Sequence, residues 1–129
     1  MQTQAPAIIL IEKDELTLEL YQRELSKSFT VFPFTEICDV LTTLANRDIK
    51  AVVIEPEIDS ARGWELIRSI QEAYQDRSIP VIVCSTRDSN NTGLARKVTK
   101  YLTKPVLPKT LREEILKVLG IKDELRKFS

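Results

Sequence analysis

Short apolar runs alternate with amphipathic segments along the whole chain, and this alternation constrains the fold more than any other feature. The runs are rich in isoleucine and valine, as is typical of strands that are buried on both faces of a sheet. They predict five strands, at residues 7–11, 29–34, 51–54, 80–84 and 101–103. The segments that follow them predict five helices, at residues 15–27, 35–45, 63–75, 90–98 and 108–119.

Prolines, glycines and capping residues mark several of the element boundaries. Pro33 indicates that the run at residues 29–34 is an edge strand or ends there. Thr35 is the expected N-cap of the next helix, because its hydroxyl can accept a hydrogen bond from the first turn. The apolar residues that follow at helical spacing are Ile37, Val40, Leu41, Leu44 and Ala45. Pro108 suits the start of the last helix, and Gly120 suits its end.

A strand–helix order that repeats five times predicts an α/β fold with a parallel sheet, helices on both faces and right-handed crossovers. In 129 residues this fits a doubly wound five-stranded sheet of order 2-1-3-4-5 with five helices. The functional site of such a sheet lies outside the carboxyl ends of its strands. We expect one domain at residues 1–120, followed by a tail or an extension of the last helix at residues 121–129.

Composition argues against several functional classes. Lysine plus arginine equals aspartate plus glutamate, 19 each, so the chain lacks the basic excess of a nucleic-acid-binding protein. No apolar run approaches the ~20 residues that span a membrane, and the first residues lack a basic signal-peptide region, so we expect a cytoplasmic protein. Cys38 and Cys84 lie in apolar segments of a chain without histidine, which predicts reduced, buried thiols rather than a metal site.

Charged and hydroxyl-bearing residues follow four of the five predicted strands. Since the carboxyl ends of parallel strands meet at one edge of the sheet, we expect these side chains to lie close together. They are Glu12, Lys13 and Asp14 after the first strand, Glu55 and Glu57 after the third, Ser85 and Thr86 after the fourth, and Lys104 after the fifth.

These residues lie in motifs that resemble the CheY-like receiver domain of two-component response regulators, a flavodoxin-like fold, over the chain up to about Leu119. The matching stretches are Ile8-Ile9-Leu10-Ile11-Glu12-Lys13-Asp14, Val52-Val53-Ile54-Glu55 with Gly63 eight positions later, Ile79-Pro80-Val81-Ile82-Val83-Cys84-Ser85, and Tyr101-Leu102-Thr103-Lys104-Pro105. All four motifs occur in the order that the family shows.

The resemblance implies a role for each matching position. In the family, an acidic pair after the first strand helps to hold Mg²⁺, and an aspartate at the end of the third strand accepts a phosphoryl group. A hydroxyl and a lysine contact the phosphoryl oxygens, and Ser85 and Lys104 occupy their positions. Tyr101 occupies the position of an aromatic that turns inward on activation. Each also has a structural interpretation: Ser85 as a strand-end hydroxyl, and Tyr101 as packing at the sheet edge.

Two positions depart from the family pattern. Glu55 stands at the acceptor position, where its extra methylene moves the carboxylate outward by ~1.5 Å. Lys13 stands at the second metal-binding position, and an ammonium cannot ligate Mg²⁺. Glu12 and Glu55 against Lys13 and Lys104 give a neutral pocket. We hypothesise that Lys13 fills the Mg²⁺ space and pairs with Glu55 or Glu12, so we expect no metal or other cofactor; alternatively, Lys13 points into solvent.

The leading interpretation is an atypical receiver, or pseudo-receiver, which is not an enzyme and signals through protein–protein contacts without aspartate phosphorylation. Glu55 either mimics a phosphorylated aspartate or pairs with lysine in a frozen inactive state. The alternative is a phosphorylatable receiver with an unusual acceptor. A nucleotide- or flavin-binding module ranks last, because no glycine-rich loop follows the first strand.

The partner that the resemblance implies is another protein, either a sensor kinase or an output protein. From composition we expect this chain by itself to bind neither nucleic acid nor a membrane. A homodimer through the fourth and fifth predicted helices is also implied by resemblance.

Overall fold

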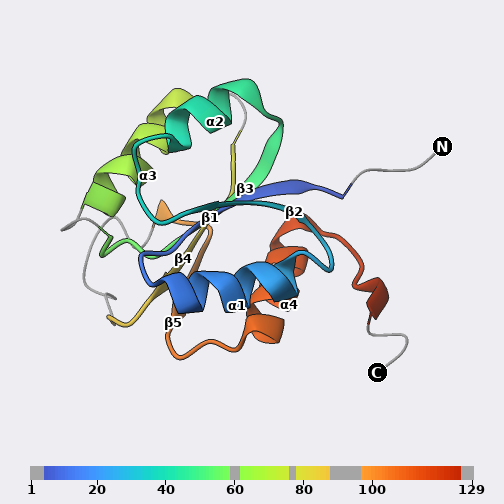
Figure 1. The fold of residues 1–129 in the computed structure, drawn as a ribbon. Helices are drawn as coiled ribbons and strands as arrows, with labels where there is room; N and C mark the ends of the chain where they lie inside the picture. The colour runs from blue at the N-terminus through green and yellow to red at the C-terminus, as the bar shows by residue number, and fades with distance from the viewer. Residues whose placement is uncertain (1–4, 59–61, 76–77, 88–96, 126–129) are drawn as a thin grey trace.

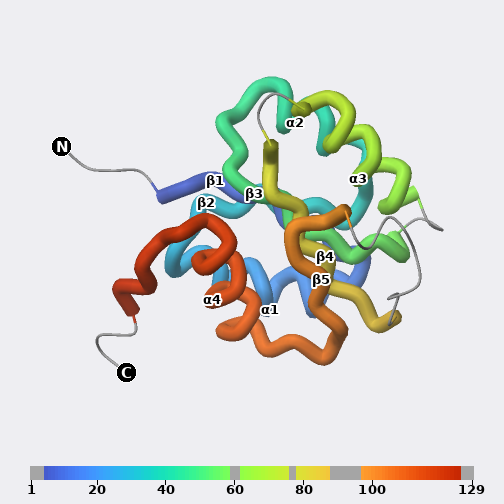
Figure 2. The backbone as a smooth tube through the Cα atoms, turned by 180° about the vertical axis from the view of Figure 1, so that it is seen from behind, coloured from blue at the N-terminus to red at the C-terminus, as the bar shows by residue number. Residues whose placement is uncertain are grey.

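The computed structural model describes residues 5–58, 62–75, 78–87 and 97–125. The elements follow one another as β1 (Ala7–Ile11), α1 (Glu15–Leu25), β2 (Thr30–Phe34), α2 (Val40–Asn46), β3 (Ile49–Ile54), α3 (Arg62–Ala73), β4 (Val81–Ser85), β5 (Lys100–Thr103) and α4 (Pro108–Leu119). The strands form one parallel sheet of order β2-β1-β3-β4-β5. Helices α1 and α4 cover one face of the sheet and α2 and α3 the other (Figure 1), as the view from behind also shows (Figure 2). The predicted fold class and strand order are confirmed.

The central strands are apolar on both faces because each face has its own core. Alternate residues of β1, such as Ile9 and Ile11, pack with α2 and α3, whereas Ile8 and Leu10 pack with α1 and α4. The same alternation runs through β3 and β4. Burying each such side chain contributes roughly 1.5–3 kcal/mol. The continuous apolar runs in the sequence therefore record two cores separated by one sheet.

Strand β2 lies at one edge of the sheet, which agrees with the interpretation of Pro33. Residue Thr30 donates its backbone N–H to the carbonyl of Pro6, and the carbonyl of Phe34 accepts from Glu12. Because backbone groups of successive residues in a strand point to opposite sides, the alternate residues Val31 and Pro33 direct theirs toward the open edge. Proline is therefore tolerated at this position.

Helix α2 begins at Val40, so the prediction that a helix follows directly from Thr35 is wrong. Residues 35–39 form bends and a turn, and Asp39 is the N-cap without a side-chain cap bond. Periodicity misled the prediction because Ile37 packs on the core from this turn, and thereby continues the apolar spacing of Val40 and Leu44. Cys38 lies in this turn and is exposed, although the sequence predicted a buried thiol. Both cysteines are free, as expected.

The fourth predicted helix falls largely outside the described residues, because residues 88–96 are not described. The described part of the chain contains four helices, against the five predicted. None of them is long and apolar enough to cross a membrane. After α4 the chain turns back, with the N–H of Ile121 donating to the carbonyl of Leu116, and Asp123 forms an ion pair with the buried Arg112.

Replacing Gly120 with alanine should lower the free energy of unfolding by about 1 kcal/mol. Gly120 ends α4 with φ of 67°, a left-handed conformation that a Cβ disfavours. Beyond the two neighbouring residues in the chain, no atom lies within 4 Å of a Cβ built there, so the effect isolates the backbone conformation. Urea unfolding measures the loss, and Gly120→Asn should lose less, because asparagine tolerates this conformation. Equal stability of wild type and Gly120→Ala would contradict the assignment.

Candidate functional site

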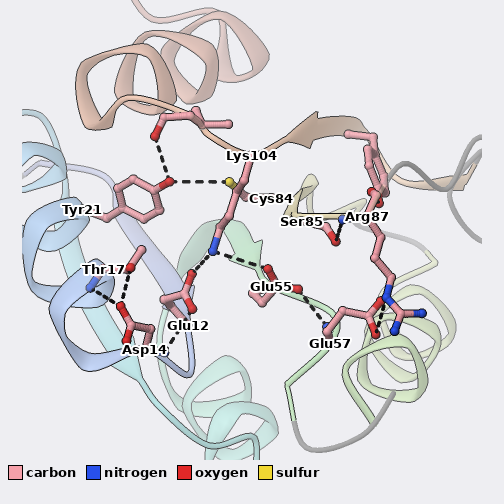
Figure 3. Close-up of polar contacts among 12 residues, drawn as sticks. Glu12, Asp14, Thr17, Tyr21, Glu55, Glu57, Cys84, Ser85, Arg87 and Lys104 are labelled. Atoms are coloured by element: carbon pink, nitrogen blue, oxygen red, sulfur yellow. Dashed lines mark hydrogen bonds and ion pairs between the residues drawn. The ribbon is translucent and has the colours of Figure 1, made fainter.

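The carboxyl ends of β1, β3 and β5 bring Glu12, Glu55 and Lys104 together, each as the first residue after its strand (Figure 3). The Lys104 ammonium donates a hydrogen bond to the carboxylate of Glu12. It also lies 3.4 Å from Oε2 of Glu55. Three of the side chains that the sequence placed at this edge therefore form one ionic cluster.

Both carboxylates of the cluster are almost fully buried, since Glu12 is 2% exposed and Glu55 is 4% exposed. Burial lowers the pKa of Lys104, but the hydrogen bond and charge of Glu12 and the charge of Glu55 outweigh it, so the pKa is raised. The lysine is thus charged at neutral pH. Two carboxylates against one ammonium give the cluster a formal charge of −1.

Each carboxylate also accepts a hydrogen bond from its own loop. Oε2 of Glu12 accepts from the N–H of Asp14 at 3.1 Å, and Oε1 of Glu55 accepts from the N–H of Glu57 at 3.0 Å. The remaining oxygen of each side chain faces Lys104. All four carboxylate oxygens therefore have a partner within the protein, and both side chains are held in a fixed orientation.

The side chains at this edge do not fit a magnesium site. Mg²⁺ requires near-octahedral oxygen ligands, whereas here an ammonium lies against both carboxylates and every carboxylate oxygen is engaged. In residues 5–58, 62–75, 78–87 and 97–125, no group of three or more acidic, histidine or cysteine side chains could hold a metal ion. The donor set favours an internal cation, Lys104, over a bound one.

Lys13 does not take the place that the sequence suggested. Its side chain is exposed, and the ion pairs of Glu12 and Glu55 among the described residues are made by Lys104. Lys13 lines a groove of about 640 Å³ together with Glu36, Ile37 and Glu65. The hypothesis that Lys13 pairs with Glu55 or Glu12 is therefore wrong, because Lys104 already contacts both carboxylates. Lys13 is instead exposed to water, where a lysine ammonium is best hydrated. The cluster is consequently negative rather than neutral.

Ser85 and Tyr101 both contact the backbone of Arg87 instead of the ionic cluster. The Ser85 hydroxyl, fully buried at the end of β4, accepts from the N–H of Arg87 at 3.1 Å. The half-buried Tyr101 ring packs on the core beside α3, and its hydroxyl donates to the carbonyl of Arg87. The Arg87 guanidinium lies 3.8 Å from Glu57, in the loop that follows Glu55. One residue thus connects the two hydroxyls with the Glu55 loop.

Three residues of this edge had no assigned role in the sequence interpretation. Asp14 caps α1 by accepting from the hydroxyl and the N–H of Thr17, and these hydrogen bonds lower its pKa. An aspartate directly before the first residue of a helix is a preferred N-cap, and this preference could have indicated the role of Asp14. The contacts of Glu57 and Arg87 depend on tertiary structure, and no local signal announces them.

Gly63 fixes how the Glu55 loop lies on α3. A Cβ at this position would lie 2.4 Å from the carbonyl oxygen of Pro56 and 2.7 Å from its Cα. Only glycine therefore allows the first turn of α3 to approach the residue that directly follows Glu55. This close approach explains the glycine that the sequence places eight positions after Glu55.

Several known proteins are similar to this chain in sequence. The chain is 28% identical over 82 residues to the chemotaxis protein CheY1 of Helicobacter pylori, which covers 61% of this chain. It is 28% identical over 88 residues to a chemotaxis protein CheY homolog of Campylobacter jejuni, which covers 66% of this chain. In each case the match spans 66% of the relative's own length.

The fold has close counterparts among solved structures. A CheY-like response regulator receiver domain protein from Methanospirillum hungatei superposes with a TM-score of 0.78 at 20% identity, covering 98% of this chain and 100% of that one. At this identity the likeness shows the fold alone. The sequence pattern that defines the response regulator receiver domain matches residues 8–116. The chain therefore belongs to the response regulator receiver domain family.

Proposed function

We propose that this chain is an atypical receiver domain, which signals through contacts with another protein and does not run the usual aspartate phosphorylation cycle. The observation that carries the proposal is the state of Glu55. At the position of the family's acceptor, it is buried, held by Lys104, and bonded to the backbone of Glu57. Both carboxylate oxygens of Glu55 therefore have partners, and neither is free to attack a phosphoryl donor.

Geometry and charge both disfavour phosphoryl transfer at this site. The extra methylene of glutamate moves the carboxylate by ~1.5 Å, and a misplacement of ~1 Å can cost ~10²-fold in rate. Transfer also needs a cation that neutralises the developing charge on the phosphoryl oxygens. Lys13 is exposed, and Lys104 already lies against both carboxylates, so the cluster offers no free carboxylate oxygen to a further cation.

The contacts around Tyr101 favour a single permanent arrangement of this side chain. The ring packs on the core and its hydroxyl donates to the carbonyl of Arg87. Arg87 is in turn linked to Glu57, whose N–H binds Glu55. We therefore favour the interpretation that Glu55 helps to hold this arrangement of Tyr101 without phosphorylation. The partner would be a sensor kinase or an output protein that recognises this arrangement.

Incubation with acetyl phosphate and Mg²⁺, followed by intact mass spectrometry, tests the proposal. The wild type should remain unmodified, because its acceptor is misplaced and engaged. The double variant Glu55→Asp, Lys13→Asp should gain one phosphoryl group. Its rate of modification should exceed any rate of the wild type by at least about 100-fold. The matched control is Glu55→Asn, Lys13→Asp, which restores the acid after β1 but offers no acceptor. A phosphoryl group on the wild type would refute the proposal.

A further inference from the structure

An apolar surface lies open along α1 and the segment before α4. Leu16 and Leu20 of α1 are 73% and 55% exposed, and Leu107 is 72% exposed. Between these elements runs a groove of about 440 Å³. Its lining residues are Thr17, Leu20, Tyr21, Thr86, Lys104, Pro105, Val106 and Pro108. Leu20 lines this groove, Leu16 precedes it by one turn of α1, and Leu107 lies between the lining residues Val106 and Pro108, so the three exposed leucines lie beside one groove. Apolar side chains grouped in this way mark interaction sites.

The charges on the exposed side of α1 are divided between its two halves. Glu15 and Glu19 lie in the N-terminal half, whereas Arg23 lies in the last turn and Lys27 just beyond it. Glu24, also in the last turn, is largely covered and pairs with Lys27 and Arg112. If a second α1 packs against the first in antiparallel orientation, the acidic half of each helix faces the basic half of the other. Glu19 then lies opposite Arg23 of the second copy, Leu20 lies near the axis, and Leu16 faces the C-terminal end of the other α1. The surface is therefore complementary to itself.

We propose that the chain forms a two-fold homodimer in which the α1 helices pack antiparallel. Leu16 and Leu20 of each copy would contact α1 and the groove beside Val106 of the other. A two-fold interface requires that one patch carries both the protruding and the receiving parts, as this surface does. The self-complementary charge pattern favours a second copy over an unrelated partner, for which no such pattern is needed.

The proposed interface centres on α1, whereas the face that the family resemblance suggested involves the fourth and fifth predicted helices. The two faces share the start of the fifth predicted helix, at Pro108. It also reaches the ionic cluster, since Lys104 and Thr86 line the same groove as Leu20. Dimerisation would cover this side of the cluster in both copies. The inference does not depend on the proposed function, because the interface makes no use of phosphorylation.

Sedimentation velocity over a wide range of protein concentration tests the apolar part of the interface. The wild type should form dimers, and Leu20→Glu should raise the dissociation constant at least about tenfold, since it places a carboxylate at the centre of the contact. The control is Leu41→Glu, because Leu41 is 44% exposed on α2, across the sheet from α1 (Figure 1). Circular dichroism confirms that both variants fold. A monomeric wild type, or equal weakening by both substitutions, would overturn the proposal.

Charge reversal tests the identity and the orientation of the partner. Glu19→Arg and Arg23→Glu each bring like charges together in the homodimer, so each variant alone should be monomeric. An equimolar mixture should form a heterodimer, because each arginine then faces a glutamate. Both variants lose the same exposed Glu19–Arg23 pair of 3.5 Å within the helix, which contributes little. If the mixture stays monomeric, the antiparallel arrangement is wrong. If the wild type binds an unrelated protein through this surface but forms no dimer, the homodimer is excluded as well.

Discussion

Replacing Lys104 with methionine should lower the free energy of unfolding at pH 7 by about 3–5 kcal/mol. The substitution leaves the buried carboxylates of Glu12 and Glu55 without their shared counter-ion, while methionine keeps the length of the side chain. Urea unfolding of both proteins measures the loss. Lys109→Met is the control, because Lys109 is exposed on α4, and it should change stability by less than about 0.5 kcal/mol. A loss of less than about 1 kcal/mol for Lys104→Met would show that the cluster is not held as described.

The stability difference between the wild type and Lys104→Met should depend on pH, because the pKa of Lys104 is raised in the folded protein. In the folded protein the lysine binds its proton more tightly than in the unfolded chain, where the pKa is about 10.4. The pairing therefore stabilises the wild type fully below about pH 10.4, and the contribution is lost as pH rises through the folded-state pKa. The difference in stability between wild type and Lys104→Met should accordingly narrow in strongly alkaline solution. An unchanged difference there would contradict the pairing.

Replacing Gly63 with alanine should lower the free energy of unfolding by about 2–3 kcal/mol. The new Cβ would lie within 2.8 Å of three backbone atoms of Pro56, so either α3 or the loop after Glu55 must move. Helix propensity alone predicts the opposite sign, a gain of about 1 kcal/mol, since alanine is the better helix former. The sign of the change therefore decides whether the close approach exists.

Urea unfolding of Gly63→Ala, with Ser69→Ala as the control, makes this measurement. Ser69 is exposed on the same helix and should tolerate alanine with little change or a small gain. Because the displaced loop carries the N–H of Glu57 that binds Glu55, chemical shifts of residues around Glu55 should also move in Gly63→Ala. Stability at or above the wild-type value would show that helix and loop are farther apart than described.

Much of the fold could be predicted from the sequence because the central strands are apolar on both faces. A continuous apolar run such as Ala7–Ile11 is typical of a central strand in a parallel sheet that helices cover on both faces. The end of the last helix was equally clear, because Gly120 adopts the left-handed conformation that its residue type favours. The start of α2 could not be predicted in this way. Ile37 satisfies the helical spacing from a turn, and spacing alone does not distinguish the two.

The site shows the same division between topology and side-chain placement. Topology brought Glu12, Glu55 and Lys104 to one edge, as expected from their positions after the strands. Which lysine binds the carboxylates is a question of direction and reach, and the sequence offered both Lys13 and Lys104. The structure pairs Lys104 and leaves Lys13 exposed. The link through the backbone of Arg87 was beyond prediction, because any residue type provides the same N–H and carbonyl.

The proline in β2 has a consequence for how molecules of this protein meet at high concentration. An open strand edge is a template on which a strand of another molecule can add, and repetition of that step leads to fibres. On the outer side of β2, Pro33 removes a donor from the row of backbone groups that such a strand would need. Growth by strand addition is therefore interrupted at this edge of the sheet.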